Sequence, residues 1–225
     1  MTTDHLAISD GVPGLVALLQ RAASINPMSV ARVVATDRTR NPADTPQPLD
    51  VFVTTPFQVL VSRRVTGTIS RDGAVCAVAQ LADKLGDTGA DGSVRMDLDS
   101  CDASWPGAVP RPAVWQEIDT LPASVVADLS QQGKNLARQF SGPMGPPASL
   151  MDQNVLTVTG NGQTTAIPMR MIFALTNFGL IPGNGAAVSI PRHIRVATAG
   201  SWQRIDAAFG SAYRTSAPGV LSLLT

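Results

Sequence analysis

Glycine and proline interrupt this chain so often that long helices have little room to form. The 225 residues include 19 glycines and 17 prolines, and both residue types mark turns and end helices. Hydrophobic residues make up 44% and charged residues 15% of the chain, a composition that supports a full hydrophobic core. The sequence therefore predicts an α+β fold of antiparallel sheets with a few short helices, and argues against an all-helical bundle.

The best candidate linker is the stretch 141–150, which is rich in glycine and proline. We expect it to separate an N-terminal α+β domain at 1–140 from a C-terminal domain at 151–225. Hydrophobic spacings typical of helices and strands predict the elements of the N-terminal domain. These are helices at 11–24, 79–85 and 122–140, and strands at 29–36, 49–54, 57–66, 75–78 and 94–98.

The C-terminal domain is predicted to be a hairpin, a helix and a second hairpin, a ββαββ unit. Strands at Val155–Thr159 and Gln163–Ile167 flank Gly160–Gly162, whose Asn-Gly pair is a strong hairpin signal. The helix Met169–Phe178 has almost no polar face, so it must be covered on more than one side. We expect one cover to be its own sheet and the other to be the first domain or a second subunit, which makes self-association an expectation.

The second hairpin turns at Gly200 and Ser201, a glycine-first pair typical of a type II′ turn. This turn sets Val196 opposite Ile205 and Arg195 opposite Asp206. Because strand side chains alternate between faces, the hairpin divides into an inner and an outer set. The inner set is Ile194, Val196, Ile205 and Ala207, and the outer set is His193, Arg195, Trp202, Arg204 and Asp206.

The outer set gathers an indole beside two guanidinium groups, which predicts a binding face. An indole can stack on a base while arginines hold phosphate or carboxylate, as on sheet surfaces that bind single strands. Arg63 and Arg64 could extend this basic surface, although adjacent strand residues point to opposite faces, so one of them at most would contribute. The residues expected to contact an acidic protein surface or nucleic acid are His193, Arg195, Trp202, Arg204 and Tyr213.

A plainer interpretation of the same face also stands. In it, Arg195 pairs with Asp206, Trp202 covers the stem of Arg204, and water solvates the rest. The chain would then be a purely structural subunit of a complex if the protein itself covered the face.

The usual catalytic motifs are absent from the sequence. It contains no Gly-x-Ser-x-Gly elbow, no phosphate-binding Gly-x-x-x-x-Gly-Lys loop and only two histidines. We therefore expect a non-catalytic binding or assembly module without cofactor or metal. The alternative is an enzyme with an unrecognised site, using His193 with Asp206 or a metal held by an aspartate-rich segment at 87–102. The aspartates in question are Asp87, Asp91, Asp97, Asp99 and Asp102.

Location and redox state follow from what the sequence lacks. The N-terminus shows no signal-peptide pattern, and no apolar run approaches the roughly 20 residues of a membrane helix, so we expect a cytoplasmic protein. Cys76 and Cys101 are the only cysteines. Two cysteines are too few for a disulfide framework in a chain of this size, so both are expected to be reduced thiols.

Three segments resemble a group of uncharacterised actinobacterial proteins of unknown function. They are TPFQVLVSRRVTG at 55–67, VWQEIDTLPA at 114–123 and SWQRIDAAFGSAY at 201–213. This resemblance implies a cytoplasmic bacterial protein and assigns no role to any residue. In order of elements, the helix, strand pair and second helix of the first domain also resemble half of a DNA sliding-clamp domain, which implies a fold and no motif.

Overall fold

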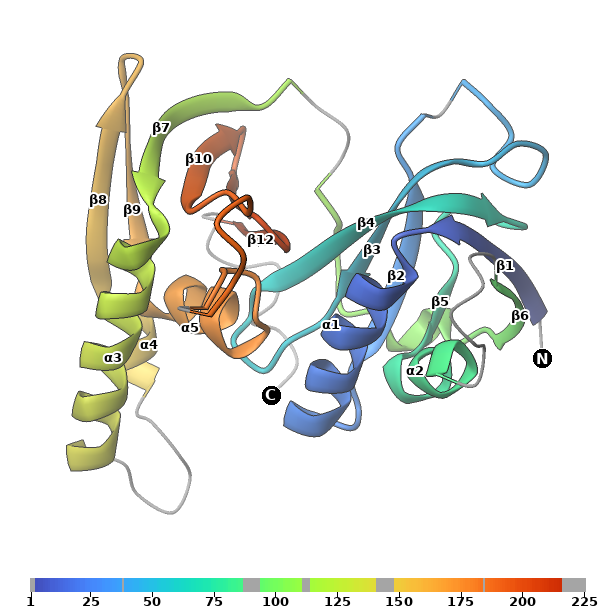
Figure 1. Cartoon of the computed structure of the whole chain (residues 1–225), viewed down its shortest axis with the longest axis horizontal. Coiled ribbons are helices and arrows are strands. Elements are labelled where there is room, and N and C mark those ends of the chain that lie inside the picture. Colours follow the sequence, from blue (N-terminus) through green and yellow to red (C-terminus); the bar gives the residue numbers. More distant parts are fainter. Residues whose placement is uncertain are drawn as a thin grey trace. The chain divides into compact units, whose positions relative to one another are not determined.

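The computed structural model of the chain forms two compact units (Figure 1). The first unit holds the described residues of 3–55 and 62–110, and the second holds those of 56–61 and 114–215. The structure describes residues 3–37, 39–86, 94–110, 114–140, 148–183 and 185–215. Within these residues, no helix is both long enough and apolar enough to cross a membrane.

The first unit is a twisted sheet with two helices packed against each other (Figure 1). Its strands follow the order β5-β2-β3-β4-β1-β6, and the first two residues of β4 belong to the second unit. Its elements are β1 (Thr3–Asp10), α1 (Val12–Ile25), β2 (Val30–Ala35), β3 (Gln47–Val53), β4 (Leu60–Ile69), β5 (Val75–Ala77), α2 (Val78–Gly86), β6 (Val94–Asp99) and the short 3-10 helix η1 (Asp102–Ser104).

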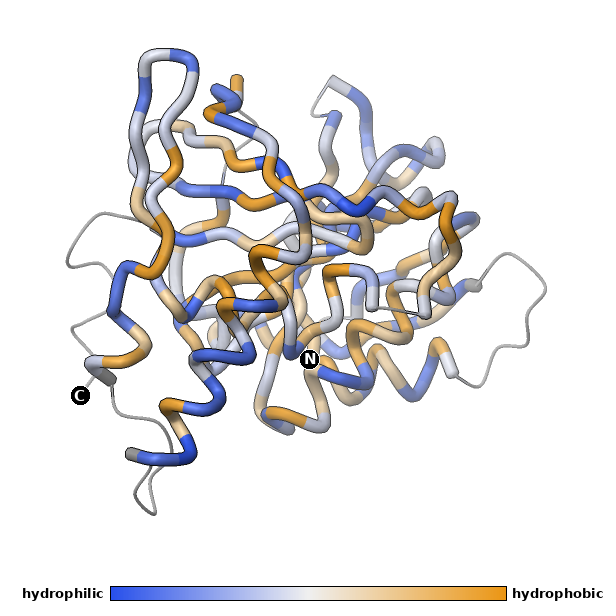
Figure 2. Tube along the Cα trace, turned by 60° about the vertical axis from the view of Figure 1, so that its left-hand side comes forward, coloured by the Kyte–Doolittle hydropathy of each residue, from blue (hydrophilic) through white to orange (hydrophobic). Residues whose placement is uncertain are grey.

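Helix α1 illustrates how local sequence sets these elements. Gly11 caps it with a φ of 91°, a left-handed conformation that glycine adopts without strain. Leu15, Leu18, Leu19 and Ala22 recur at helical spacing, and all four are buried. The predicted helix at 11–24 is therefore confirmed. Figure 2 shows hydrophobic and hydrophilic residues interspersed along the chain.

The second unit places one helix between a second helix and a sheet. Its four-stranded sheet has the order β7-β10-β11-β12, and β8 and β9 form a separate hairpin. Its elements are β7 (Gln116–Pro122), α3 (Ala123–Phe140), α4 (Ala148–Asp152), β8 (Asn154–Gly160), β9 (Gln163–Pro168), α5 (Met169–Asn177), β10 (His193–Ala199), β11 (Trp202–Ala207) and β12 (Gly210–Thr215).

Helix α5 is the centre of the second unit. All residues from Met169 to Leu175 are buried. Helix α3 approaches so closely that a Cβ atom added at Gly133 would lie 2.7 Å from Met169 and 2.9 Å from Phe173. The Phe57 ring lies 6.4 Å from that of Phe173. Cover on more than one side is thus confirmed, and the second cover is α3, a segment that the sequence placed in the first domain. Because Met169 to Leu175 are all buried, these residues offer no exposed surface for the self-association predicted through the helix.

The structure also adds and regroups elements. Strands β1, β7 and β12 were not predicted: β1 lies between β4 and β6, and β7 and β12 flank the hairpin of β10 and β11. Helix α3, predicted as part of the N-terminal domain, belongs to the second unit because it packs on α5. Of the predicted linker at 141–150, residues 141–147 lie outside the described residues and the remainder begins α4.

Candidate functional site

The hairpin of β10 and β11 has the predicted register. Gly200 begins the turn with a φ of 56°, Val196 pairs with Ile205, and Arg195 pairs with Asp206. Ile194, Val196 and Ile205 are fully buried. Strand alternation therefore places the opposite side chains on the outer face. We call this the polar hairpin face, and it comprises His193, Arg195, Trp202, Arg204 and Asp206.

The five predicted contact residues differ in how far they can be reached. His193 and Arg195 are exposed, whereas Trp202 and Arg204 are half-buried. Tyr213 lies on β12 directly opposite Arg204 and is buried, with only 6% of its surface exposed. The structure thus brings all five onto neighbouring strands but leaves mainly His193, Arg195 and part of Trp202 open to a partner. Their role in binding stays a prediction.

Trp115, from the segment just before β7, covers part of this face. Its ring centroid lies 4.4 Å from the Arg204 guanidinium carbon and 5.9 Å from the Tyr213 ring, at an angle of 64°. Cation–π and edge-to-face contacts of this kind hold the three side chains together. The plainer interpretation expected Trp202 to cover Arg204, and Trp115 does so instead.

Ion pairs on the face also differ from the expected one. Asp206 accepts a hydrogen bond from the Ser211 hydroxyl at 2.6 Å and pairs with Arg204 at 3.0 Å. Arg195 instead lies 3.6 Å from Glu117 of β7, and about half of each side chain is exposed. A loose, solvated pair contributes little stability, so an incoming phosphate or carboxylate can replace Glu117 at Arg195.

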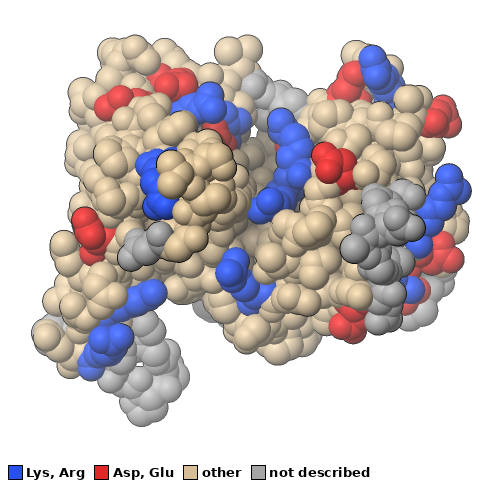
Figure 3. Space-filling model, viewed as in Figure 1, with Lys and Arg blue, Asp and Glu red and all other residues tan. Residues whose placement is uncertain are grey.

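Arg63 and Arg64 point to opposite sides of β4, as strand alternation requires. The Arg63 guanidinium lies against Gly14 of α1, and burial lowers its pKa. Arg64 is exposed and binds Asp50 through two contacts of 2.8 Å. Figure 3 shows basic side chains in small groups separated by other residues over the face drawn.

The aspartate-rich segment does not gather into one site among the described residues. Asp97 binds His5 at 2.6 Å, Asp99 binds Gln80, and Asp102 binds Arg71. Asp87 and Asp91 lie outside the described residues. Within the described ranges, no three histidine, cysteine, aspartate or glutamate side chains are grouped to hold a metal ion.

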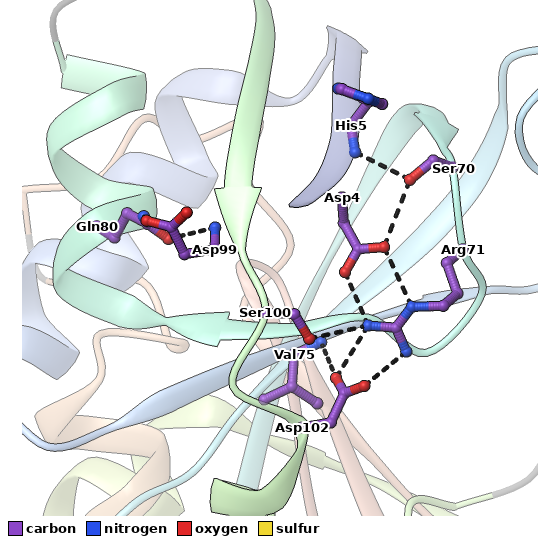
Figure 4. A network of polar contacts seen from close by, with 9 residues as sticks. All are labelled: Asp4, His5, Ser70, Arg71, Val75, Gln80, Asp99, Ser100 and Asp102. Carbon is purple, nitrogen blue, oxygen red and sulfur yellow. Dashed lines mark hydrogen bonds and ion pairs between the residues drawn. The ribbon is translucent and has the colours of Figure 1, made fainter. Parts of the chain in front are cut away.

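Asp102 instead belongs to a polar network that ties β1 to the segment after β6 and of which Asp4 is the buried member (Figure 4). Arg71 donates to Asp4 at 2.7 and 3.1 Å, to Asp102 at 3.0 Å and to Ser100 at 3.1 Å. Its hydrogen bonds to the Asp4 and Asp102 side chains raise its pKa, and the bond from Arg71 lowers the pKa of Asp102. These groups satisfy one another, so the network stabilises the unit. Sequence alone gave no signal for it, because its members are far apart in the chain.

The two cysteines are free thiols, as predicted. Burial raises the pKa of Cys76 to about 12, and it also raises the pKa of the partly buried Cys101. A thiol with a raised pKa is a poor nucleophile at neutral pH. Both side chains therefore act as small hydrophobic groups.

Two families match the chain in succession. Residues 1–107 match a domain of unknown function (DUF8010), and residues 110–219 match another domain of unknown function (DUF8185). The junction between the two matches lies close to the boundary between the two structural units. No curated protein matches the sequence at a significant level.

The fold is similar to that of bacterial DNA polymerase sliding clamps. A ligand-bound clamp from Pseudomonas aeruginosa aligns with a TM-score of 0.55 and 13% identity, over 96% of this chain and 65% of that one. The Caulobacter crescentus clamp gives 0.53 and 11%, over 96% and 66%. The Bartonella birtlesii clamp bound to griselimycin gives 0.52 and 12%, over 96% and 66%.

The chain therefore spans just under two thirds of the length of these clamps. At such low identity the likeness shows the fold alone. The resemblance inferred from the order of elements in the first half of the chain extends, as a fold, to almost all of it.

Proposed function

We propose that this chain is a non-catalytic binding or assembly module that contacts an acidic protein surface or nucleic acid through the polar hairpin face. The observation that carries the proposal is the sliding-clamp fold over 96% of the chain. The similar proteins are subunits or clamps of DNA polymerase, so they work by assembling with another macromolecule. A cytoplasmic location, an actinobacterial origin and self-association remain part of the proposal.

The contact would centre on Arg195. Its side chain is about half exposed, and within the described residues its one ion pair is the loose contact with Glu117. His193 stands two positions away on the same face, and Trp202 adds half-exposed indole surface. An arginine beside an aromatic ring suits both carboxylate and phosphate partners. Arg204 and Tyr213 would support the face from beneath rather than touch the partner.

The test compares Arg195→Ala and Trp202→Ala with Arg64→Ala, which removes an exposed arginine from the first unit. Fluorescence anisotropy would follow binding to labelled single-stranded and duplex oligonucleotides, and affinity capture with crosslinking would follow protein partners. We expect Arg195→Ala to weaken binding roughly tenfold. The slope of log affinity against log salt concentration should fall by about one. Arg64→Ala should change neither.

Unchanged binding by the Arg195→Ala, Trp202→Ala double variant would remove the proposal. The chain would then be a structural subunit, in which Trp115 and its neighbours simply close the sheet. Folding of each variant would be checked by circular dichroism, so that a lost contact is not confused with a lost fold.

A further inference from the structure

A groove on the first unit has no part in the proposed function. It lies over β4, β1 and β6, has a volume of about 420 Å³, and falls in the size range of small-molecule sites. Strand β1 runs between the other two, and its outward residues alternate with the buried Asp4, Leu6 and Ile8. The groove is thus built on the solvent side of the sheet.

Strand register arranges the groove as two rows across three strands. In the first row, the Ser70 hydroxyl, directly after β4, accepts a hydrogen bond from the His5 amide, and His5 pairs with Asp97 of β6. In the second row, Ala7 pairs with both Thr68 and Arg95. Because the methyl group of Ala7 is much shorter than its neighbours, the middle of the second row is hollow.

A wall from the segment between β2 and β3 closes one side. Ala43 lines the groove from a turn that Asn41 and Asp44 brace with a side-chain hydrogen bond of 2.9 Å. The Ile69 amide donates to the Pro42 carbonyl at 2.9 Å, which fixes this turn to the end of β4. The wall is therefore held by main-chain contacts and not by chance side-chain packing.

The charged and titratable side chains lining the groove are His5, Arg95 and Asp97. Asp97 can only accept, so the 2.6 Å contact means that His5 donates from Nδ1 and keeps Nε2 for another partner. Arg95 is exposed and makes no ion pair or hydrogen bond within the described part of the chain. The groove therefore contains two basic side chains, Arg95 and His5, and one carboxylate, Asp97, which already contacts His5.

We infer that this groove binds a small molecule through a tetrahedral oxyanion such as a phosphate group. Arg95, Thr68 and His5 come from three different strands and all line the groove, so their donors surround the hollow at Ala7. That arrangement fits the oxygens of a tetrahedral anion better than a planar carboxylate. With Nδ1 bound to Asp97, Nε2 is the ring atom that His5 has left for the anion, to which it donates when it carries a proton.

The first experiment titrates the full chain with inorganic phosphate and follows amide resonances of β1 and β6 by nuclear magnetic resonance. Arg95→Ala should weaken binding about tenfold or more, because it removes a charged donor. Ala7→Leu should abolish binding, since the larger side chain fills the hollow without altering the charge of the groove. The matched control Arg64→Ala should bind as the wild type does. Equal loss in Arg64→Ala, or none in Arg95→Ala and Ala7→Leu, would mean an adventitious ion only.

A second arm uses sulfate, which has the same tetrahedral shape as phosphate. Sulfate should also bind, and His5→Gln should weaken its binding. Unchanged binding of sulfate by His5→Gln would overturn the part given to His5. Acetate binding as tight as sulfate would overturn the tetrahedral oxyanion itself.

Discussion

Replacing Arg71 by alanine is the sharpest test of how the first unit is held together. The Asp4 side chain is only 4% exposed, and Arg71 supplies it with hydrogen bonds of 2.7 and 3.1 Å. In the described part of the chain, its one other donor is the Ser70 hydroxyl, at the limiting distance of 3.5 Å. Arg71→Ala therefore leaves a buried carboxylate almost without a partner. Removing one member of a buried ion pair typically lowers the free energy of unfolding by about 3–5 kcal/mol.

The geometry places the expected cost toward the lower end of that range. The Arg71 side chain is 39% exposed, so water can follow into the space that alanine leaves. We expect a loss of about 3 kcal/mol in the free energy of unfolding of the first unit. If the unpaired charge is the cause, the double variant Asp4→Leu, Arg71→Met should lie within about 1 kcal/mol of the wild type, because apolar residues of similar volume often replace a buried ion pair without loss.

Native-state hydrogen exchange measures this locally, which matters because a chain of two units need not unfold in one step. Protection of the slowest β1 and β2 amides should fall in Arg71→Ala and return in the double variant. Equal losses in the single and double variants would refute the reasoning, since packing and not the stranded carboxylate would then be responsible.

Four further variants test other contacts. Asp102→Asn should reduce the loss of stability in acid. A carboxyl whose folded pKa lies below its usual 3.8 stabilises the fold above that pH, and the effect is lost as pH falls through the folded pKa. Acid denaturation of the variant and the wild type measures the difference. Gly67→Ala should cost at least about 2 kcal/mol in urea denaturation, because its Cβ would lie 2.1 Å from a carbonyl oxygen of β1. At Gly86, an added Cβ would meet no described residue within 4 Å, so Gly86→Ala should cost much less. Gly133→Ala should lower the melting temperature despite gaining about 1 kcal/mol of helix propensity, because the methyl group would meet α5 at 2.7 Å. Trp115→Ala should cost the second unit about 2–3 kcal/mol and raise the exposure of the arginine beneath it, which denaturation and arginine labelling would detect.

Short-range signals in the sequence were enough to place the hairpins and most helices. The Gly200–Ser201 turn fixes the register of β10 and β11, because a two-residue loop leaves one pairing. Gly160–Gly162 does the same for β8 and β9. Strand β1 escaped prediction although Leu6 and Ile8 alternate with His5, Ala7 and Ser9, since an inward-pointing Asp4 breaks the apolar pattern. That aspartate is tolerated only through its long-range pairing with an arginine.

Gly133 shows a second limit of local sequence. Within a helix it indicates weakness, because glycine disfavours the helical state. Its role depends on how closely α3 approaches α5, and a side chain there would meet Met169. A glycine within a predicted helix can therefore mean either a weak helix or close packing against a second helix. Only the fold shows that Gly133 is the second case.

The polar hairpin face shows why alternation along a strand predicts a face but not its accessibility. Alternation placed the Arg195 and Arg204 side chains outward, and both lie on the expected side. What covers them is decided elsewhere: Trp115 arrives from before β7 and stacks on Arg204, whereas Arg195 meets only a half-exposed Glu117. Replacing Arg195 and Arg204 together would combine a loss of stability from Arg204, which packs on Trp115, with a loss of binding from Arg195. Because Arg195 can be removed without uncovering the sheet, a change at that position alone reports on a partner.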